Sequence, residues 1–447
     1  MPACPGRTSR SKAVISMQTC RLRLAGPYLR IMDAEGISRG HRLLSHGRRI
    51  ATGPTLLARI FSGGFHRMLD GFDRGIEKGA IHLQLPDGSC RTLGGRAPGF
   101  EAELEIRDWR ALIRLGTGGS VGLYQAWEAG EIDSPDLVPF FANIMDNGDV
   151  LGETGRAKGP WRWAARWLHR LNRNTRSRAE KNIHAHYDLG NDFYGAWLDP
   201  TMSYSSAYRV AGDQLEAAQK RKWQRLADRL DHPGSVLEIG CGWGALSSFF
   251  ARQGSQVTAI SLSDEQLEWA GSRHPGVEFR KQDYRDVAGQ FDGIVSVEMV
   301  EAVGREYWPD FFGCLARNLK PGGRAAIQFI SMKDSLFEGY ARSADFIQSY
   351  IFPGGLLIRT SEFRRLAEEH GLSWEDQEDF GLDYAETLRL WRRRFDEAEQ
   401  AGRLPAGFDE PFCRLWRFYL MYCEGGFRGG GINVSQVTLA KPQPMLR

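Results

Sequence analysis

The sequence predicts an α/β fold in which a doubly wound, mostly parallel sheet follows a small α+β domain. Three observations lead to this prediction. An apolar strand at residues 236–239 runs into a glycine-rich turn and a helix, strands and helices alternate from 256 to 330, and residues 81–106 alternate apolar and charged positions. The first two patterns are typical of parallel sheets with helical crossovers, and the third of short antiparallel strands.

Composition limits the class of protein. The chain has 447 residues, of which 42% are hydrophobic, and a formal net charge of +3, which is sufficient for two globular domains. Its seven cysteines are an odd number and include no C-x-x-C pair, so we predict neither a disulfide framework nor a metal site. The compartment that we expect is a reducing cytoplasm. No run approaches the roughly 18 apolar residues that span a bilayer, so membrane contact must be peripheral.

Residues 1–49 form a basic N-terminal extension that we place outside the fold. No acidic residue precedes Asp33. This composition resembles that of a transit peptide, but disorder, or a start codon assigned upstream of Met17 or Met32, explains it as well.

Residues 50–150 are predicted to form the small α+β domain. The segments "IHLQLPDG" and "FEAELEIRDW" read as antiparallel strands because turn signals stand between them. Helices are expected at 109–116 and 138–145, with the glycine-rich "GTGGS" as a turn between them.

Residues 151–183 are predicted to be a basic, tryptophan-rich linker. Every charged residue from Arg156 through Arg178 is basic, and Trp161, Trp163 and Trp167 lie among them. This pattern suits an anionic bilayer surface. The alternative is a linker helix whose tryptophans pack on a neighbouring domain, and only the charge supports nucleic acid.

The glycine-rich turn begins the second domain. Gly240, Gly242 and Gly244 let the backbone turn sharply and approach a ligand, while the following helix presents free N–H groups. In a doubly wound sheet, ligands bind at the carboxyl ends of the strands. Those ends are predicted at 240–244, 261–266, 283–285 and 298–301. Glu298 and Glu301 therefore fall on the ligand-binding edge, although acids at a helix start are also favoured by the helix dipole.

These motifs resemble the class I S-adenosylmethionine-dependent methyltransferases, which have a Rossmann-like sheet. The resemblance rests on E-x-G-x-G-x-G at 238–244, on "QDYRD" and on "LKPGG". A dinucleotide-binding site is a poorer match, because the third-glycine spacing differs and the second strand ends in "SLSDEQ" without a terminal acid.

A narrower resemblance covers residues 184–447, the predicted methyltransferase domain. The stretch "HYDLGNDFYGAWLDPTMSYSSAY" resembles the cyclopropane-fatty-acyl-phospholipid synthases and mycolic acid methyltransferases, and the match continues through "YIFPGG", "FGLDYAETLRLW" and "YLMYCEGGFR". The resemblance implies methyl transfer from S-adenosylmethionine to the cis double bond of an acyl chain in membrane phospholipids, giving a cyclopropane. The same transfer giving a methyl-branched or methylene chain is the alternative.

The family commonly holds a bicarbonate ion as the base, and the resemblance implies its ligands here. Glu301, Tyr384 and Cys423 match, whereas Ser206 replaces a cysteine and Gln328 replaces a histidine. Glutamine cannot exchange protons at neutral pH, so the two changes bear on the product. We expect Glu301 to orient the base. The alternative for Cys423 is that it is an ordinary buried thiol without a role in binding the anion.

The resemblance also implies a set of cofactor-binding residues. Tyr204 and Ser205 would close over the methionine portion, Gln266 would bind the ribose unless it is a surface helix residue, and Glu298 would lie near the sulfonium or serve only as a helix-start acid. The full expected set is Tyr204, Ser205, Glu238, Gly240, Cys241, Gly242, Gly244, Ser261, Gln266, Asp283, Tyr284, Arg285 and Glu298.

Two other classes stay open: a small-molecule N-methyltransferase, and an inactive lipid-binding relative. A nucleic-acid base methyltransferase is not expected, because the fourth strand ends in "SVEMVEAVG" and not in an Asn/Asp-Pro-Pro-aromatic motif. The protein is expected in the cytoplasm, where its partner would be the anionic phospholipid surface at the inner face of the membrane, and no nucleic acid is expected as a partner. The oligomeric state is left open, a homodimer included.

Overall fold

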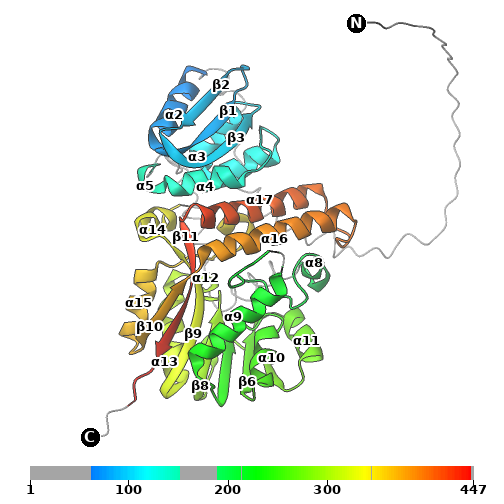
Figure 1. The fold of residues 1–447 in the computed structure, drawn as a ribbon, viewed down its shortest axis with the longest axis vertical. Helices are drawn as coiled ribbons and strands as arrows, with labels where there is room; N and C mark the ends of the chain where they lie inside the picture. The colour runs from blue at the N-terminus through cyan, green and yellow to red at the C-terminus, as the bar shows by residue number, and fades with distance from the viewer. Residues whose placement is uncertain (1–61, 152–188, 213, 344, 444–447) are drawn as a thin grey trace, which may run out of the picture. The chain divides into compact units, whose positions relative to one another are not determined.

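The computed structural model describes residues 62–151, 189–212, 214–343 and 345–443 (Figure 1). The predicted N-terminal extension and nearly all of the basic linker lie outside these residues. Within them, no helix has the length and apolar character needed to cross a bilayer.

The N-terminal part contains a four-stranded sheet in the order β2-β1-β3-β4. Its elements are α2 (Ser62–Gly75), β1 (Lys78–Gln84), β2 (Cys90–Gly94), β3 (Ala97–Ile106), α3 (Arg110–Glu128), β4 (Ile132–Asp133), α4 (Val138–Asp146) and α5 (Gly148–Leu151). The expectation of only antiparallel strands is wrong, because β3 pairs with β1 in parallel. Gly95 donates its backbone N–H to the Gly79 carbonyl beside the start of β1, and the chain thereby passes to the far side of β1.

The "GTGGS" segment breaks the helix, as predicted. It lies inside α3, where Gly119 has non-helical dihedrals, φ 57° and ψ −133°, and divides α3 into two helical stretches. The second stretch begins directly after this glycine, whereas the next helix had been predicted at 138–145. A positive φ costs little at a residue without a Cβ, so the glycine accommodates the kink.

The main sheet has seven strands in the order β10-β11-β9-β8-β5-β6-β7. The strands are β5 (Ser235–Ile239), β6 (Gln256–Ser261), β7 (Val277–Lys281), β8 (Phe291–Val297), β9 (Leu319–Met332), β10 (Ser373–Asp379) and β11 (Ile432–Ala440). Strands β7, β6, β5, β8 and β9 pair in parallel, while β11 runs antiparallel to both of its neighbours. The predicted doubly wound, mostly parallel sheet is confirmed.

Helices connect and cover this sheet. They are α8 (Asn191–Gly195), α9 (Leu215–Leu230), α10 (Ala245–Arg252), α11 (Asp264–Arg273), α12 (Val300–Val303), α13 (Trp308–Asn318), α14 (Asp334–Ala341), α15 (Thr360–Glu369), α16 (Gly381–Gln400) and α17 (Glu410–Arg428), with a π-turn, η3, at Ile347–Ile351. Side-chain caps start two of them: Ser263 accepts from the Gln266 N–H at the start of α11, and Asp409 accepts from the Phe412 N–H at the start of α17.

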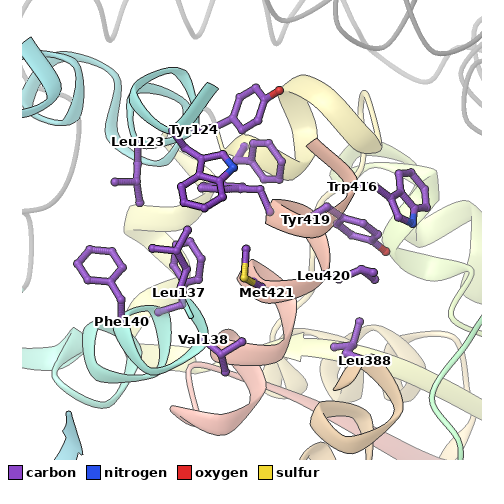
Figure 2. Packing of buried hydrophobic residues seen from close by; sticks show 14 of the residues in the cluster. Leu123, Tyr124, Leu137, Val138, Phe140, Leu388, Trp416, Tyr419, Leu420 and Met421 are labelled. Atoms are coloured by element: carbon purple, nitrogen blue, oxygen red, sulfur yellow. The ribbon is translucent and has the colours of Figure 1, made fainter. Parts of the chain in front are cut away.

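Helix α17 packs closely against α4 of the N-terminal part. A Cβ added to Gly425 would lie 2.3 Å from the Phe141 Cβ. Figure 2 shows Leu137 and Val138 beside Met421 of α17. These residues belong to one buried apolar cluster that joins both parts of the chain, so the N-terminal part contributes to the same core as α16 and α17.

Candidate active site

The loop after β5 has the conformation that its glycines predict. Gly240, Gly242 and Gly244 have φ of 83°, 51° and 79°, in the left-handed region. An added Cβ at Gly240 would lie 2.7 Å from Met299 Cγ, and one at Gly244 would lie 2.7 Å from Phe279 Cζ. The backbone therefore passes close to its neighbours and leaves room for a ligand above the carboxyl end of β5.

A cavity of about 190 Å³ lies at this loop, and we call it the donor cavity. Ten of the expected cofactor residues line it, namely Tyr204, Ser205, Glu238, Gly240, Cys241, Gly242, Ser261, Gln266, Tyr284 and Glu298. Gln266 is buried and accepts a hydrogen bond from Ser261 Oγ at 3.3 Å, so it is not a surface helix residue.

Three expected cofactor residues do not line the donor cavity. Gly244 belongs to the glycine loop but does not line the cavity. The Asp283 carboxylate pairs with the Arg285 guanidinium at 2.5 Å. Asp283 also accepts the Arg285 backbone N–H at 2.9 Å. This pair fixes the turn that carries Tyr284, which does reach the cavity.

Lys222 is a residue of the donor cavity that the sequence analysis missed. It is 1% exposed, and its Nζ donates to Ser205 Oγ at 2.6 Å. Burial lowers the pKa of this lysine to about 8, while the nearby charges of Glu298, Asp199 and Glu238 act in the opposite direction. A signal existed in the sequence, because Lys222 falls on the apolar stripe of α9 at helical spacing.

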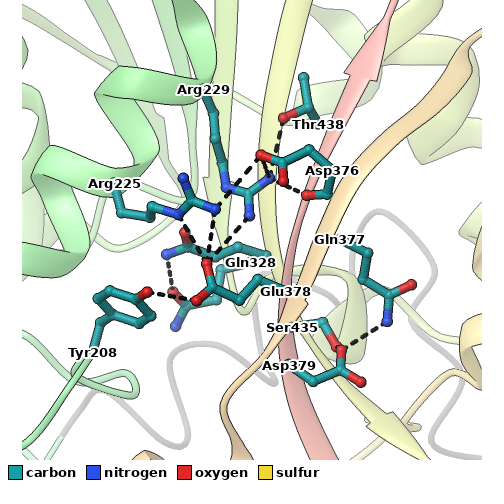
Figure 3. A network of polar contacts seen from close by, with 11 residues as sticks. Tyr208, Arg225, Arg229, Gln328, Asp376, Gln377, Glu378, Asp379, Ser435 and Thr438 are labelled. Carbon is teal, nitrogen blue, oxygen red and sulfur yellow. Dashed lines mark hydrogen bonds and ion pairs between the residues drawn. The ribbon is translucent and has the colours of Figure 1, made fainter.

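An ion-pair network holds α9, and with it Lys222, against the sheet. Arg225 lies one helical turn beyond Lys222 and donates to Glu378 of β10 at 2.9 Å, and Arg229 pairs with Asp376 at 3.0 Å. The Tyr208 hydroxyl donates to Glu378 at 2.6 Å. Figure 3 shows these groups together.

Glu238 is the second buried ionisable group at the start of the loop. Its carboxylate accepts a hydrogen bond from Ser247 Oγ. Burial raises the pKa of Glu238 to about 8. The donor cavity thus combines the Lys222 ammonium, the Glu238 carboxyl group and the loop amides, a set of polar groups suited to the amino-acid portion of S-adenosylmethionine.

A second, larger cavity of about 430 Å³ adjoins the first, and we call it the apolar cavity. Residues of α3, α4, α14, η3 and α17 line it, and most of them are apolar or aromatic. Tyr204, Glu298 and Ala302 line both cavities, so the two meet at these side chains. Glu301, Tyr384 and Cys423, three of the expected catalytic residues, line the apolar cavity.

The expected anion ligands converge on Glu298 and not on Glu301. Glu298 Oε1 accepts from the Ser206 N–H at 2.9 Å and from Gln328 Nε2 at 2.8 Å, and its Oε2 accepts from the Tyr384 hydroxyl at 2.7 Å. Burial raises the pKa of Glu298, an effect that Lys222 and these hydrogen bonds reduce. The residue has φ of 52°.

Ser206 and Gln328 lie behind Glu298, since neither of them lines the two cavities formed by the described residues. The Ser206 hydroxyl donates to the Ala207 carbonyl, and Gln328 Oε1 accepts from Gln436 Nε2 at 3.0 Å. The Ser206 backbone N–H donates to Glu298, and Gln328 Nε2 donates to Glu298 and, at 3.4 Å, to the Ser206 carbonyl. These groups therefore do not fit an external bicarbonate as the resemblance implies, because the chain's own carboxylate takes their hydrogen bonds.

Glu301 is held differently. Its Oε1 accepts the Ile330 backbone N–H, and its Oε2 has no hydrogen-bond partner among the described residues. Burial raises the pKa of Glu301 to about 8. Burial likewise raises the pKa of the Cys423 thiol far above its ordinary value, so this thiol is neutral at physiological pH.

A doubly wound sheet with a glycine loop and a donor cavity at its carboxyl edge defines a class I methyltransferase, and comparisons with known proteins give its family. The family described as mycolic acid cyclopropane synthetase matches residues 174–437. The tuberculostearic acid methyltransferase UfaA1 of Mycobacterium tuberculosis is 38% identical over 83% of this chain and 91% of its own length. The cyclopropane-fatty-acyl-phospholipid synthase of Escherichia coli is 34% identical over 78% and 90%.

A solved structure agrees with these matches. The mycolic acid cyclopropane synthase CmaA1, complexed with SAH and CTAB, is 30% identical with a TM-score of 0.54 and covers 59% of this chain and 98% of its own. The chain belongs to the mycolic acid cyclopropane synthetase family and is an S-adenosylmethionine-dependent methyltransferase.

Proposed function

We propose that the protein transfers a methyl group from S-adenosylmethionine to the cis double bond of an unsaturated acyl chain in membrane phospholipids, and that the product is a cyclopropane. The observation that supports this most is the apolar cavity of about 430 Å³ that meets the donor cavity at Tyr204, Glu298 and Ala302. A cavity of this lining suits an acyl chain, and its contact with the donor cavity supports methyl transfer to such a chain.

The side chains at the junction suit a cationic reaction. S-adenosylmethionine supplies an electrophilic methyl group when bound, and an alkene that takes this group becomes positively charged. Tyr204 lines both cavities, and Tyr384 and Tyr419 line the apolar cavity. The hydroxyls of Tyr204 and Tyr419 are hydrogen-bonded at 2.8 Å. Aromatic faces stabilise a cation, and a cavity closed by them excludes water that would capture it.

The alternative product has specific support as well. The relative from Mycobacterium tuberculosis is named for methyl transfer in tuberculostearic acid, and the one from Escherichia coli for cyclopropane synthesis, at comparable identity and coverage. The same cation gives a methyl-branched alkene when a proton leaves a neighbouring chain carbon. It gives a methylene chain when a hydride first moves from the methylated carbon to the cationic carbon and the new methyl then loses a proton. The product is therefore set by which proton the base removes and by whether the hydride shift comes first.

One assay tests the acceptor and the product together. The purified protein is incubated with methyl-labelled S-adenosylmethionine and vesicles of a cis-monounsaturated phospholipid, and the released fatty acids are analysed by mass spectrometry and NMR. Cyclopropane protons are the expected result. Olefinic protons on an acyl chain that carries the label would establish the alternative product, and label appearing only on added small amines would refute lipid methylation.

A further inference from the structure

We propose that Glu298 is the base of this reaction: its carboxylate accepts the proton that leaves the cationic product, so the enzyme needs no bicarbonate. The inference rests on the proposed function, methyl transfer to an acyl alkene. It goes beyond that function because it assigns the proton acceptor to a side chain of the protein itself.

The first observation is position. Glu298 lines both cavities, whereas none of the expected catalytic residues does. Its carboxylate therefore lies where the methyl group would pass from the donor to the acceptor. A base must lie within hydrogen-bond reach of the proton that it removes. Glu301, Tyr384 and Cys423 line the apolar cavity only.

The second observation is the hydrogen-bond pattern. The Ser206 N–H, Gln328 Nε2 and the Tyr384 hydroxyl are three groups that were expected to hold a small carboxylate-like anion. All three donate to the two oxygens of Glu298. The side chain therefore occupies the place of that anion, and the glutamine at 328 suits this role, because it has to orient a carboxylate and not to exchange protons.

The third observation is the backbone. Glu298 has φ of 52°, in the left-handed region that favours glycine. A residue with a side chain adopts this backbone conformation only at a cost in free energy, and residues in such conformations cluster at functional sites. Among the described residues, Ser206, Gln328 and Tyr384 supply the contacts that hold it there.

The alkene supplies the electron pair for the new carbon–carbon bond. Its π pair forms a bond to the methyl carbon while the S–CH₃ bond breaks, that bond's pair staying on sulfur, and the other alkene carbon becomes cationic. One C–H pair of the added methyl then closes the ring to that carbon. The released proton goes to a Glu298 oxygen, and solvent takes it when the product leaves.

The test compares Glu298→Gly with Glu301→Gln in buffer freed of carbon dioxide. Glycine suits the backbone at 298, so Glu298→Gly should fold, which thermal unfolding checks, and should bind S-adenosylhomocysteine within about twofold of the parent protein. Because a positioned base contributes roughly 10²-fold or more, turnover should fall by that factor. Added formate or bicarbonate should restore at least tenfold in Glu298→Gly and nothing in Glu301→Gln.

The parent protein supplies the decisive control. It should turn over at the same rate with and without added bicarbonate, and a rate that collapses when bicarbonate is removed would overturn the inference. So would full activity of Glu298→Gly, or loss of S-adenosylhomocysteine binding without rescue by formate. If Glu298→Gly does not fold, Glu298→Gln is tested in its place. This variant must lose turnover and still bind S-adenosylhomocysteine. A parent protein inactive on every lipid would refute the proposed function itself, which is a separate result.

Discussion

Lys222 is a single buried cation in the donor cavity, and its contact with Ser205 Oγ places it beside the expected methionine portion of the cofactor. We predict that Lys222→Met weakens S-adenosylhomocysteine binding roughly tenfold or more, since a hydrogen bond to a charged group contributes about 1.5–3 kcal/mol. Calorimetry measures this. Lys220→Met is the matched control, because Lys220 is exposed on the same helix and, among the described residues, forms its ion pair with Glu216. Equal loss of affinity for methylthioadenosine, which lacks the amino-acid portion, would contradict this placement.

Glu301 gives a pH dependence of stability with a definite sign. Burial raises its pKa from 4.5 to about 8, so the folded state binds more protons than the unfolded state between these values, and the stability that Glu301 contributes must fall as pH rises from about 5 to 8. Glu301→Gln should flatten this fall in denaturant titrations at pH 5.5 and 8. The pKa of Glu238 is also raised, and its contribution to the pH dependence of stability is the same in the parent protein and the variant. Identical slopes in parent and variant would show that Glu301 does not titrate in this range.

At the scale of elements, the sequence was informative where structure is local. The strand, glycine loop and helix at residues 235–252 were predictable, because three glycines with positive φ and an apolar strand lie within one stretch. The parallel pairing of β1 with β3 was not, since it depends on which side of β1 the chain passes.

The candidate site was predictable as a set of residues but not as a set of contacts. Ser206, Gln328 and Tyr384 come from separate parts of the chain, and whether they meet Glu298 or Glu301 depends on the φ of 52° at Glu298. Sequence patterns assign that conformation to glycine and do not predict it for a glutamate. The family resemblance alone led us to expect that Glu298 would bind the cofactor and that Glu301 would orient the base.

The contact between α17 and α4 can be tested through a glycine. We predict that Gly425→Ala destabilises the protein by about 1–3 kcal/mol, because the new methyl would lie 2.3 Å from the Phe141 Cβ and 2.9 Å from the Val138 carbonyl oxygen. Thermal unfolding measures it. Gly71→Ala in α2 is the control: its Cβ meets nothing within 4 Å, so it should stabilise by about 0.5–1 kcal/mol. A neutral Gly425→Ala would mean that α4 and α17 move apart easily.

At the scale of the whole molecule, the proposed function requires that acyl chains of a bilayer reach the apolar cavity, and no helix of the described residues is able to span a bilayer. The net charge of +3 is small, so the protein as a whole is only weakly attracted to an anionic surface. The basic, tryptophan-rich stretch at residues 156–178, which lies outside the described residues, is the segment whose composition suits an anionic surface. We propose it as the site of peripheral contact with the inner face of the membrane.

Replacing Trp161, Trp163 and Trp167 with alanine should therefore separate membrane binding from chemistry. Burying an aromatic side chain contributes roughly 1.5 kcal/mol or more, so the loss of three indoles should lower co-sedimentation with anionic vesicles by at least about tenfold. Turnover on detergent-dispersed phospholipid should be retained, because the two cavities described above are lined by other residues. High salt should weaken vesicle binding of the parent protein, since the basic residues act through screened charges. Unchanged vesicle binding by the triple variant would defeat the anchor, and the tryptophans would then belong to packing within the protein.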